Sequence, residues 1–372
     1  MALRLATTTL NLPDGPVEVA VGEATPAQQL ECCKLAGTAF AAPLSQAQYV
    51  ELEDYLGNLP LAVDRGRRYW CLFPTNNPNC ILATCKTLHR FILVRKGTEV
   101  SENDGYCIAS VITNPAYRKA GLASVLLGHV AEWMDGPGAG MASMLYTSIG
   151  DFYAKRGWGP LPAFESTLRC ATAATTLDRP PSLSGTRLLN PGDIDGLCTR
   201  DVEGIKLEMR QMQISSTGQR QVAVAPTADL INLLQERANF MASRQFGKAT
   251  EHRGAISDSG DSWIYWYHDF RKQQLAVLRV RLPHEVGPRQ LEQLVSLLLD
   301  ALEEAGAWSL PKVTIWDANP VVLQALDLLK HRHAVEVATG QRHQRSIPSL
   351  RWKGDDGSET ATLYYNEFYA WS

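Results

Sequence analysis

One stretch decides how the chain folds: residues 106–134 read YCIASVITNPAYRKAGLASVLLGHVAEWM. The residues up to Thr113 favour a strand, and Asn114-Pro115 ends that run. Residues 118–121 (RKAG) form a basic turn, and an apolar stripe over residues 122–134 predicts a helix. A strand, a glycine-containing turn and a helix N-terminus therefore follow one another directly.

The start of this helix is suited to an anion. A helix N-terminus leaves backbone N–H groups unpaired and carries a partial positive charge. Gly121 allows the backbone to approach a ligand closely, and small Ala123 keeps the first turn uncrowded. Arg118 and Lys119 add positive charge. A plain strand-to-helix turn with a solvated basic pair has the same residues, so the turn alone leaves both interpretations open.

Length and composition fit a globular protein of roughly two domains. The chain has 372 residues, of which 45% are hydrophobic and 20% charged, with a net charge of −3. Without a basic excess, we expect no nucleic acid and no membrane as a partner. The N-terminal stretch lacks an apolar core of signal-peptide length, and no run of about 18 apolar residues occurs, so we expect a cytoplasmic protein.

The cysteines indicate neither disulfides nor a metal site. The chain has eight cysteines, and none of them forms a C-x-x-C pair. We expect buried free thiols, as is usual in a reducing compartment. No Cys/His cluster has zinc spacing, so we expect no metal.

The order of the predicted elements suggests an internal duplication. In both halves, two strands, a helix, a strand and a helix follow one another. In the first half these are strands at 91–95 and 106–113, the helix at 122–134, a strand at 143–149 and a short helix at 151–157. In the second half they are a hairpin at 263–282, a helix at 288–306, a strand at 312–319 and a helix at 320–331.

Earlier elements are also predicted, namely strands at 69–73 and 81–86 and two helices that begin after the capping boxes Thr25/Gln28 and Ser45/Gln48. The Pro/Thr/Ala-rich stretch at 171–187 is typical of a linker. We therefore expect domains at 1–170 and 188–372. The glycine turn occurs only in the first, because the matching stretch of the second reads RLPHEVGPRQL with two prolines.

The motif R-x-x-G-x-A at 118–123, followed by a strand and then by FYAKRGW at 152–158, resembles the GNAT acetyltransferase superfamily over residues 17–169. The resemblance implies an α/β fold with a mixed sheet in the N-terminal half. The C-terminal half would be a second, degenerate GNAT-like domain that closes the acceptor site. Neither G-x-G-x-x-G nor the G-K-[S/T] of a P-loop occurs.

The resemblance also implies where acetyl-CoA, the cosubstrate, would bind. The strands at 106–113 and 143–148 would splay apart around it, and backbone groups of Val111, Ile112 and Thr113 would pair with the pantetheine. The N–H of Ile112 would polarise the thioester carbonyl. The pyrophosphate would lie on the turn and the first helical residues, which are Arg118, Lys119, Ala120, Gly121, Leu122, Ala123 and Ser124.

Tyr153 matches the tyrosine that often protonates the departing thiolate in this superfamily, and it is the predicted catalytic residue. A thiol pKa of roughly 8.5 and a tyrosine pKa of about 10 make that proton transfer feasible in a dry site. A packing role beside Phe152 and Trp158 is the alternative. Phe152 and Trp158 themselves are expected to be core residues.

A finer resemblance concerns the acceptor. Residues 43–56, 81–93, 107–127 and 143–158, and the aromatic tail LYYNEFYAWS at 363–372, are similar to fungal L-lysine N6-acetyltransferases. This implies a small-molecule amine as the acceptor, most of all the side-chain amine of L-lysine. In that family an acidic residue commonly follows the cysteine of the third strand, whereas Lys86 follows Cys85 here.

An amine acceptor needs a base, because only about one lysine ammonium in 2,500 is deprotonated at pH 7. Candidate bases are His89 and four carboxylates, Glu51, Glu53, Asp54 and Glu367, each of which also fits a solvated surface charge. Two other functions stay open. The chain could be a protein N-acetyltransferase, or a regulatory protein that binds acyl-CoA without catalysis. The oligomeric state cannot be predicted from the sequence.

Overall fold

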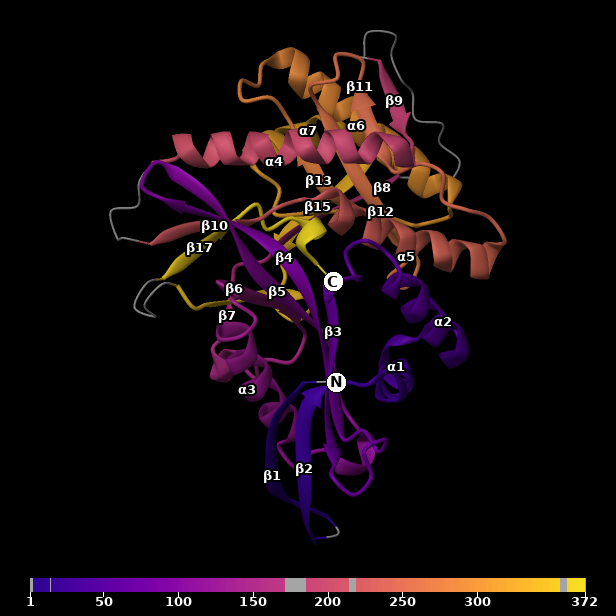
Figure 1. The fold of residues 1–372 in the computed structure, drawn as a ribbon. Coiled ribbons are helices and arrows are strands. Elements are labelled where there is room, and N and C mark those ends of the chain that lie inside the picture. The colour runs from indigo at the N-terminus through magenta and orange to yellow at the C-terminus, as the bar shows by residue number, and fades with distance from the viewer. Residues whose placement is uncertain (1–2, 14, 171–184, 214–218, 355–359, 372) are drawn as a thin grey trace.

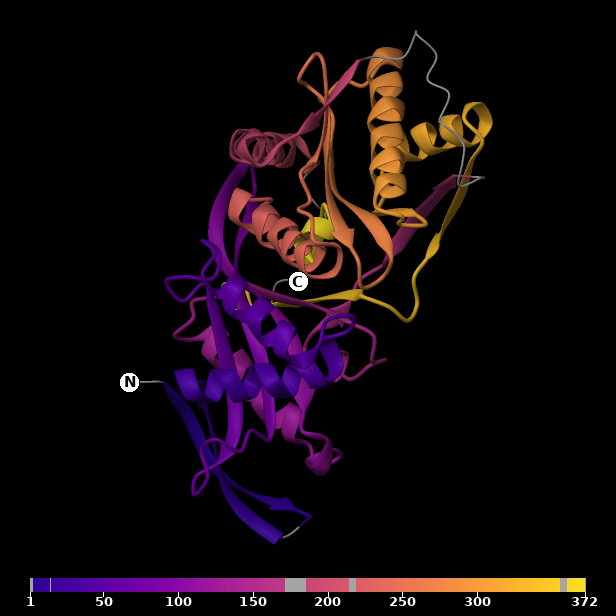
Figure 2. The same ribbon diagram turned by 90° about the vertical axis from the view of Figure 1, so that its right-hand side faces the viewer.

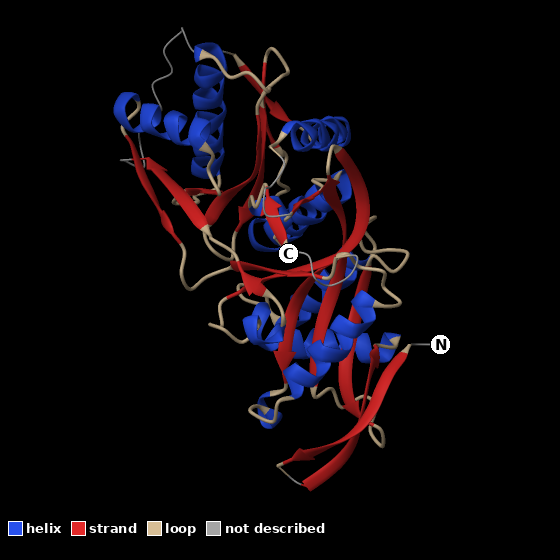
Figure 3. Cartoon of the chain, turned by 90° about the vertical axis from the view of Figure 1, so that its left-hand side faces the viewer, coloured by secondary structure: helices blue, strands red, loops and turns tan. Residues whose placement is uncertain are grey.

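A computed structural model describes residues 3–13, 15–170, 185–213, 219–354 and 360–371. These residues form two mixed sheets, each flanked by helices (Figures 1 and 3). The mixed α/β fold class predicted from the sequence is confirmed.

The first sheet has ten strands among the described residues. Its main path is β1 (Arg4–Leu12), β2 (Gly15–Glu23), β3 (Arg67–Pro74), β4 (Ala83–Lys96), β5 (Glu99–Thr113), β6 (Ala142–Thr147), β16 (Ile347–Trp352) and β7 (Gly159–Pro160). β10 (Arg220–Val224) pairs with the second part of β4 and with β17 (Ala361–Tyr364). The strands predicted at 81–86 and 91–95 are parts of one long strand, β4. Its first part pairs with β3 and its second part pairs with β10.

Three helices cover the two faces of this sheet: α1 (Pro26–Phe40), α2 (Gln46–Gly57) and α3 (Leu122–Asp135). Both predicted capping boxes are present, with Thr25 before α1 and Ser45 before α2. Alternate residues of β3 pack on opposite sides, as the two-residue period of a strand requires. Trp70 and Leu72 join the core under α3, whereas Cys71 and its odd-numbered neighbours join the core under α1.

The second sheet has seven strands among the described residues. In order they are β15 (Val335–Gln341), β8 (Phe164–Cys170), β14 (Val313–Trp316), β13 (Gln274–Arg281), β12 (Trp263–Asp269), β11 (Gly254–Ser257) and β9 (Thr186–Leu189). Its helices are α4 (Ile194–Gln211), α5 (Ala228–Phe246), α6 (Pro288–Ala307) and α7 (Pro320–Arg332). Figure 2 shows α4 and α5 on one side of this sheet and α6 and α7 on the other. Short 3-10 helices are η1 (Pro115–Tyr117), η2 (Ala154–Arg156), η3 (Pro191–Asp193) and η4 (Phe368–Ala370).

The two halves have the same core arrangement. An antiparallel hairpin, a helix and a parallel strand recur as β4, β5, α3 and β6 and as β12, β13, α6 and β14. The internal duplication expected from the element order is therefore visible in the topology.

The halves also exchange strands. β16 comes from the second half and pairs antiparallel with β6, whereas β8 comes from the first half and pairs antiparallel with β14. The sheets therefore do not coincide with residues 1–170 and 188–372. Most of the predicted linker, residues 171–184, lies outside the described residues. Thr186 and Arg187, predicted to be linker, belong instead to β9, because they pair with Ser257 and Ile256 of β11.

Candidate active site

The parallel strands β5 and β6 separate partway along their length. They pair at Gly105 with Ala142, at Tyr106 with Ser143 and at Cys107 with Met144, and no later pair connects them although both strands continue. A cavity of about 420 Å³ lies at this separation. The gap has the position expected for acetyl-CoA from the resemblance.

Both halves of the chain line the cavity. The first half contributes the ends of β5 and β6, residues between α1 and α2, and Tyr153. The second half contributes residues of α5, of the end of β12, of the turn after it, of the segment before β16 and of the tail; they are Arg237, Met241, Tyr267, Asp269, Arg271, Lys272, Ser346 and Trp371. In Figure 1 the C-terminus lies between the two sheets.

β5 carries a bulge beside the cavity. Lys86 of β4 pairs with Ala109, but Thr84, two residues earlier, pairs with Ile112, three residues later. β5 therefore has one extra residue here, and Ser110 within this bulge has a left-handed φ of 52°. Val111 lines the cavity, whereas Ile112 does not appear among the described residues that line it. The Asn114 N–H donates to the carbonyl oxygen of Leu82, just before β4 (2.9 Å). Backbone N–H groups alternate sides along a strand, so the N–H of Ile112, two residues earlier, also faces β4.

Two residues of the turn before α3 have a left-handed backbone conformation. Gly121 is the N-cap of α3 with φ 74°, and Lys119 also has a positive φ of 69°. A Cβ atom built at Gly121 would have no neighbour within 4 Å, so the space beside this helix end is open to a ligand. Arg118, Lys119 and Gly121 are exposed.

A residue that sequence reasoning missed lies beside this helix end. Arg156 of η2 donates to Ser124 Oγ in the first turn of α3 and stacks on Phe152, with its guanidinium carbon 3.8 Å from the ring centroid. Its Nε atom is buried and has no hydrogen-bond partner among the described residues. Arg156 thus adds a third basic side chain to the candidate phosphate site. Its place in FYAKRGW gave no hint, because it stands 32 residues after Ser124 in sequence.

Tyr153 lies at the cavity wall and is buried, with 6% of its surface exposed. Burial raises the pKa of Tyr153, and the neighbouring Cys85 thiol adds to that effect. The phenol therefore keeps its proton at neutral pH, as a proton donor must. Trp158 is buried and donates from Nε1 to Ser143 Oγ (3.1 Å), which confirms its predicted core position.

Lys86 forms a buried ion pair at the cavity wall. Its Nζ atom lies 2.8 Å from Glu53 Oε2 and 2.9 Å from Oε1, and both side chains are buried. Burial alone would raise the pKa of Glu53, but Lys86, Arg237 and Arg67 outweigh it and hold that pKa below its usual value. A carboxylate from α2 thus compensates the lysine at the position where the family commonly has an acidic residue.

The other candidate bases do not line the cavity. His89 Nε2 lies 2.7 Å from Asp104 Oδ1, and Glu51 forms an exposed ion pair with Arg244. Asp54 is exposed and Glu367 lies in the second half, as described below. Asp269 is the one carboxylate among the described residues that line the cavity, and nothing in its sequence context distinguished it.

The aromatic tail docks, as expected for apolar residues at a chain end. Phe368, Tyr369 and Ala370 are buried, and Tyr369 OH donates to the Val224 carbonyl oxygen (2.7 Å). Trp371 follows them into the cavity wall.

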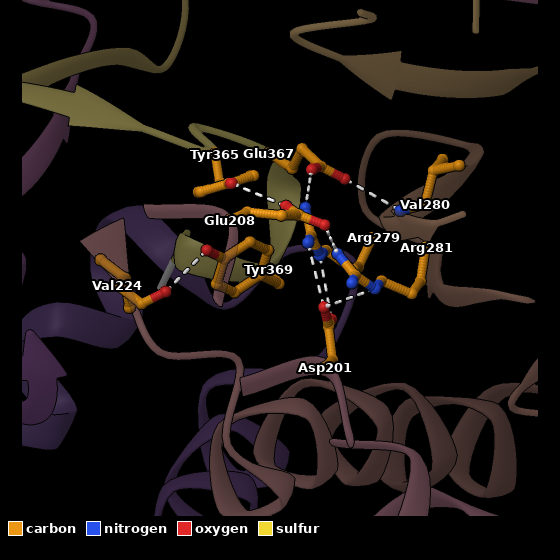
Figure 4. Close-up of polar contacts among 9 residues, drawn as sticks. All are labelled: Asp201, Glu208, Val224, Arg279, Val280, Arg281, Tyr365, Glu367 and Tyr369. Carbon is orange, nitrogen blue, oxygen red and sulfur yellow. Dashed lines mark hydrogen bonds and ion pairs between the residues drawn. The ribbon is translucent and has the colours of Figure 1, made fainter. Parts of the chain in front are cut away.

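The second half has its own splayed strands, and side chains of β13 and of the C-terminal tail line the cleft between them. β13 and β14 pair from Leu275 to Val277 and then separate around a cavity of about 380 Å³. There, Glu367 accepts a hydrogen bond from the Val280 N–H (2.9 Å) and forms an ion pair with Arg279 (Figure 4).

Further charged side chains lie around this cleft. Asp201 accepts from Arg279 at 2.9 and 3.0 Å, and Glu208 accepts from Arg281 and from Tyr365 OH (Figure 4). The start of α6 is capped by Gln290, which accepts from the Gly287 N–H (3.1 Å). The N–H groups of Val280 and Gly287 in this half are therefore satisfied internally.

The seven cysteines whose side chains the structure describes are all free, and all but Cys80 are buried. In the described part of the chain, no group of His, Cys, Asp and Glu has the arrangement of a metal site. No helix among the described residues has the length and apolarity needed to cross a bilayer.

Comparison with known sequences identifies the family. A family model described as the LYC1 GNAT-like C-terminal domain matches residues 171–372, more than half of the chain. A lysine acetyltransferase of Yarrowia lipolytica is 22% identical over 362 residues, covering 82% of this chain and 89% of the relative. An uncharacterised protein of Saccharomyces cerevisiae is 22% identical over 298 residues, covering 73% of this chain and 74% of the relative.

Solved structures agree on the fold. A GCN5-related N-acetyltransferase from Kribbella flavida has a TM-score of 0.54 at 14% identity, covering 90% of this chain and 71% of the other. Eis1 from Mycobacterium abscessus has a TM-score of 0.52 at 15% identity, covering 90% and 73%. With two GNAT-like halves and a matching family model, the chain is an acetyltransferase and belongs to the LYC1-like family of GNAT proteins.

Proposed function

We propose that the protein transfers the acetyl group of acetyl-CoA directly to the side-chain amine of a small amino acid, most of all L-lysine. The observation that carries this proposal is the cavity at the β5–β6 separation, because residues of the second half line it and would cover a bound acceptor. A small acceptor gains affinity only when most of its surface is buried. The lysine acetyltransferase of Yarrowia lipolytica supports the choice of substrate.

The described residues fit acetyl-CoA at this place. The open helix end at Gly121 and the basic side chains of Arg118, Lys119 and Arg156 would hold the pyrophosphate. The backbone of Val111, Ile112 and Thr113 would border the pantetheine arm. Ala120, Leu122, Ala123 and Ser124 would complete the phosphate turn.

We assign the thioester-polarising N–H to Val111 rather than to Ile112, because Val111 lines the cavity and the Ile112 amide faces β4. In the reaction the acceptor nitrogen forms a bond to the carbonyl carbon, and the carbon–sulfur bond then breaks. Tyr153 would give its phenolic proton to the departing thiolate. The acceptor ammonium would lose one proton to water or to a base before the attack and a second as the amide forms, and one proton would return to Tyr153, so that one proton is released overall.

The test is product identification with purified full-length protein, acetyl-CoA and a panel of free amines, lysine-containing peptides and buffer alone. We expect N6-acetyl-lysine by mass spectrometry, with stoichiometric release of CoA thiol. Acetylation of peptides in preference to free lysine would favour a protein acetyltransferase. Binding of acetyl-CoA without transfer to any amine would favour a regulatory protein, and either result would overturn the proposal.

A further inference from the structure

The charged residues of the candidate active-site cavity are unequal in sign. Among the described residues that line it, Lys86, Arg237, Arg271 and Lys272 are cations and Asp269 is the one carboxylate. A site that received only an ammonium group would be expected to show the opposite balance, because like charges repel. The excess of cations therefore calls for an anion.

The carboxylate of Glu53 compensates the charge of Lys86, but the same carboxylate also pairs with Arg67. Glu53 lies 2.8 Å from Lys86 and 3.4 Å from Arg67. One carboxylate thus serves two cations in direct contact, and it also attracts Arg237 without forming an ion pair with it, so three cations share a single negative charge.

Arg237 projects from α5 in the second half, and its Nε atom is buried without a hydrogen-bond partner among the described residues. Buried guanidinium groups normally have their N–H donors satisfied, since an unpaired buried donor is costly. Arg237 lines the cavity and donates no hydrogen bond to a described residue, so its guanidinium has N–H groups available to a ligand there.

Two more cations follow β12 on the same wall. Arg271 donates to the Ala39 carbonyl oxygen (3.3 Å), and Lys272 donates to Ser346 Oγ (3.3 Å). Neither residue, nor Arg237, makes an ion pair with any described residue of the chain. Asp269 offsets one charge at most, and its oxygens already accept from the Lys272 N–H and from Gln274.

We propose that Arg237, assisted by Arg271 and Lys272, binds the carboxylate of the acceptor and so makes the enzyme select an amino acid over the diamine of the same length. The inference rests on the proposed function, and it adds which group of the substrate is recognised and by which residues. A guanidinium pairs with a carboxylate through charge-assisted hydrogen bonds, which are stronger than neutral ones. An acceptor without a carboxylate would leave Arg237 without this partner, whereas the exposed Arg271 and Lys272 would stay in contact with water.

The experiment compares L-lysine with cadaverine, which has the same terminal amine and chain but no carboxylate. Lysinamide, in which the carboxylate is neutralised, is a second probe. We expect kcat/KM of the unmodified protein to be roughly 10- to 100-fold higher for L-lysine than for either probe, the range for a hydrogen bond to a charged group. Equal use of lysine and cadaverine would overturn the inference while leaving acetyl transfer established.

The matching variant is Arg237→Met. It should raise KM for L-lysine by a similar factor, with a much smaller effect on the rate with cadaverine and on KM for acetyl-CoA. Arg237→Lys, which keeps the charge, should retain part of the preference. Arg244→Met is the control, because Arg244 lies on the same helix but pairs with Glu51 at the surface.

An equal loss with lysine and cadaverine in Arg237→Met would assign Arg237 to packing and overturn the inference. If neither amine is acetylated by the unmodified protein, both the inference and the proposed substrate fail. Thermal melting of each variant shows whether it is folded, and Arg237→Lys decides the matter if Arg237→Met is not.

Discussion

At the scale of single residues, the pairing of Lys86 with Glu53 changes how the role of both residues is interpreted. In the sequence, Lys86 is a departure from the family and Glu53 fits a surface charge. In the structure they are buried partners at 2.8 Å, and Tyr69 OH also donates to Glu53. The lowered pKa of Glu53 means that its ionised form stabilises the fold at neutral pH.

Replacing Glu53 by Gln should therefore lower the free energy of unfolding by about 3–5 kcal/mol at pH 7, because Lys86 would remain buried without its partner. The unmodified protein should lose stability as the pH falls below the ordinary carboxyl value of 4.5, and Glu53→Gln should lack this part of the loss. Urea unfolding followed by circular dichroism from pH 7 downward measures both effects. Glu51→Gln at the surface should cost less than about 1 kcal/mol, and an equal cost at both positions would refute the argument.

Tyr153 allows binding and chemistry to be separated. Tyr153→Phe keeps the buried ring but removes the proton, so kcat should fall roughly 100-fold while the Kd for acetyl-CoA stays the same. Steady-state kinetics and calorimetry check the two quantities. An equal loss of rate and affinity would show that the residue acts by packing, as its contact with Phe152 would allow.

At the scale of elements, the N-terminus of α3 depends on one glycine. Gly121 has φ 74° and open space beside it, so a side chain there would meet a bound pyrophosphate rather than the protein. Gly121→Val should weaken acetyl-CoA binding more than about 10-fold, partly because a β-branched residue resists positive φ.

The matched control is Gly128→Val in the same helix, where the space is also open and φ is ordinary. It should leave the Kd unchanged by calorimetry. Unchanged affinity in a folded Gly121→Val variant would remove the phosphate site from this turn.

At the scale of the whole molecule, the duplicated halves have different functions. Each has splayed parallel strands, but Glu367 binds the Val280 N–H in the second cleft. The exchange of β8 and β16 between the sheets holds the halves together around the first cavity. Removal of the second half would therefore also remove a strand from the first sheet.

We expect one acetyl-CoA per chain as a consequence. Native mass spectrometry at increasing acetyl-CoA concentration should saturate at a single bound molecule. Gly121→Val should weaken that binding more than about 10-fold, whereas Glu367→Gln should leave it in place. A second molecule that survives Gly121→Val would mean that the C-terminal cleft is open to the ligand.

The sequence by itself determined the local elements and the family. The capping boxes, the strand–turn–helix at 106–134 and the repeated element order all depend on neighbouring residues, so short-range patterns were enough to predict them. The glycine turn before α3 is likewise a local pattern, although the left-handed φ of Gly121 was not predicted from it.

Only the tertiary structure decided which distant residues meet. The exchanged strands, the Glu53–Lys86 pair and the approach of Arg156 to α3 join positions more than thirty residues apart, and no periodicity records such contacts. The cation-rich wall is assembled in the same way, because Lys86 of β4 and Arg237 of α5 come together only when the two halves pack. Burial and charge pairing depend on three-dimensional neighbours, so the sequence could name candidates for the acceptor site but not choose among them.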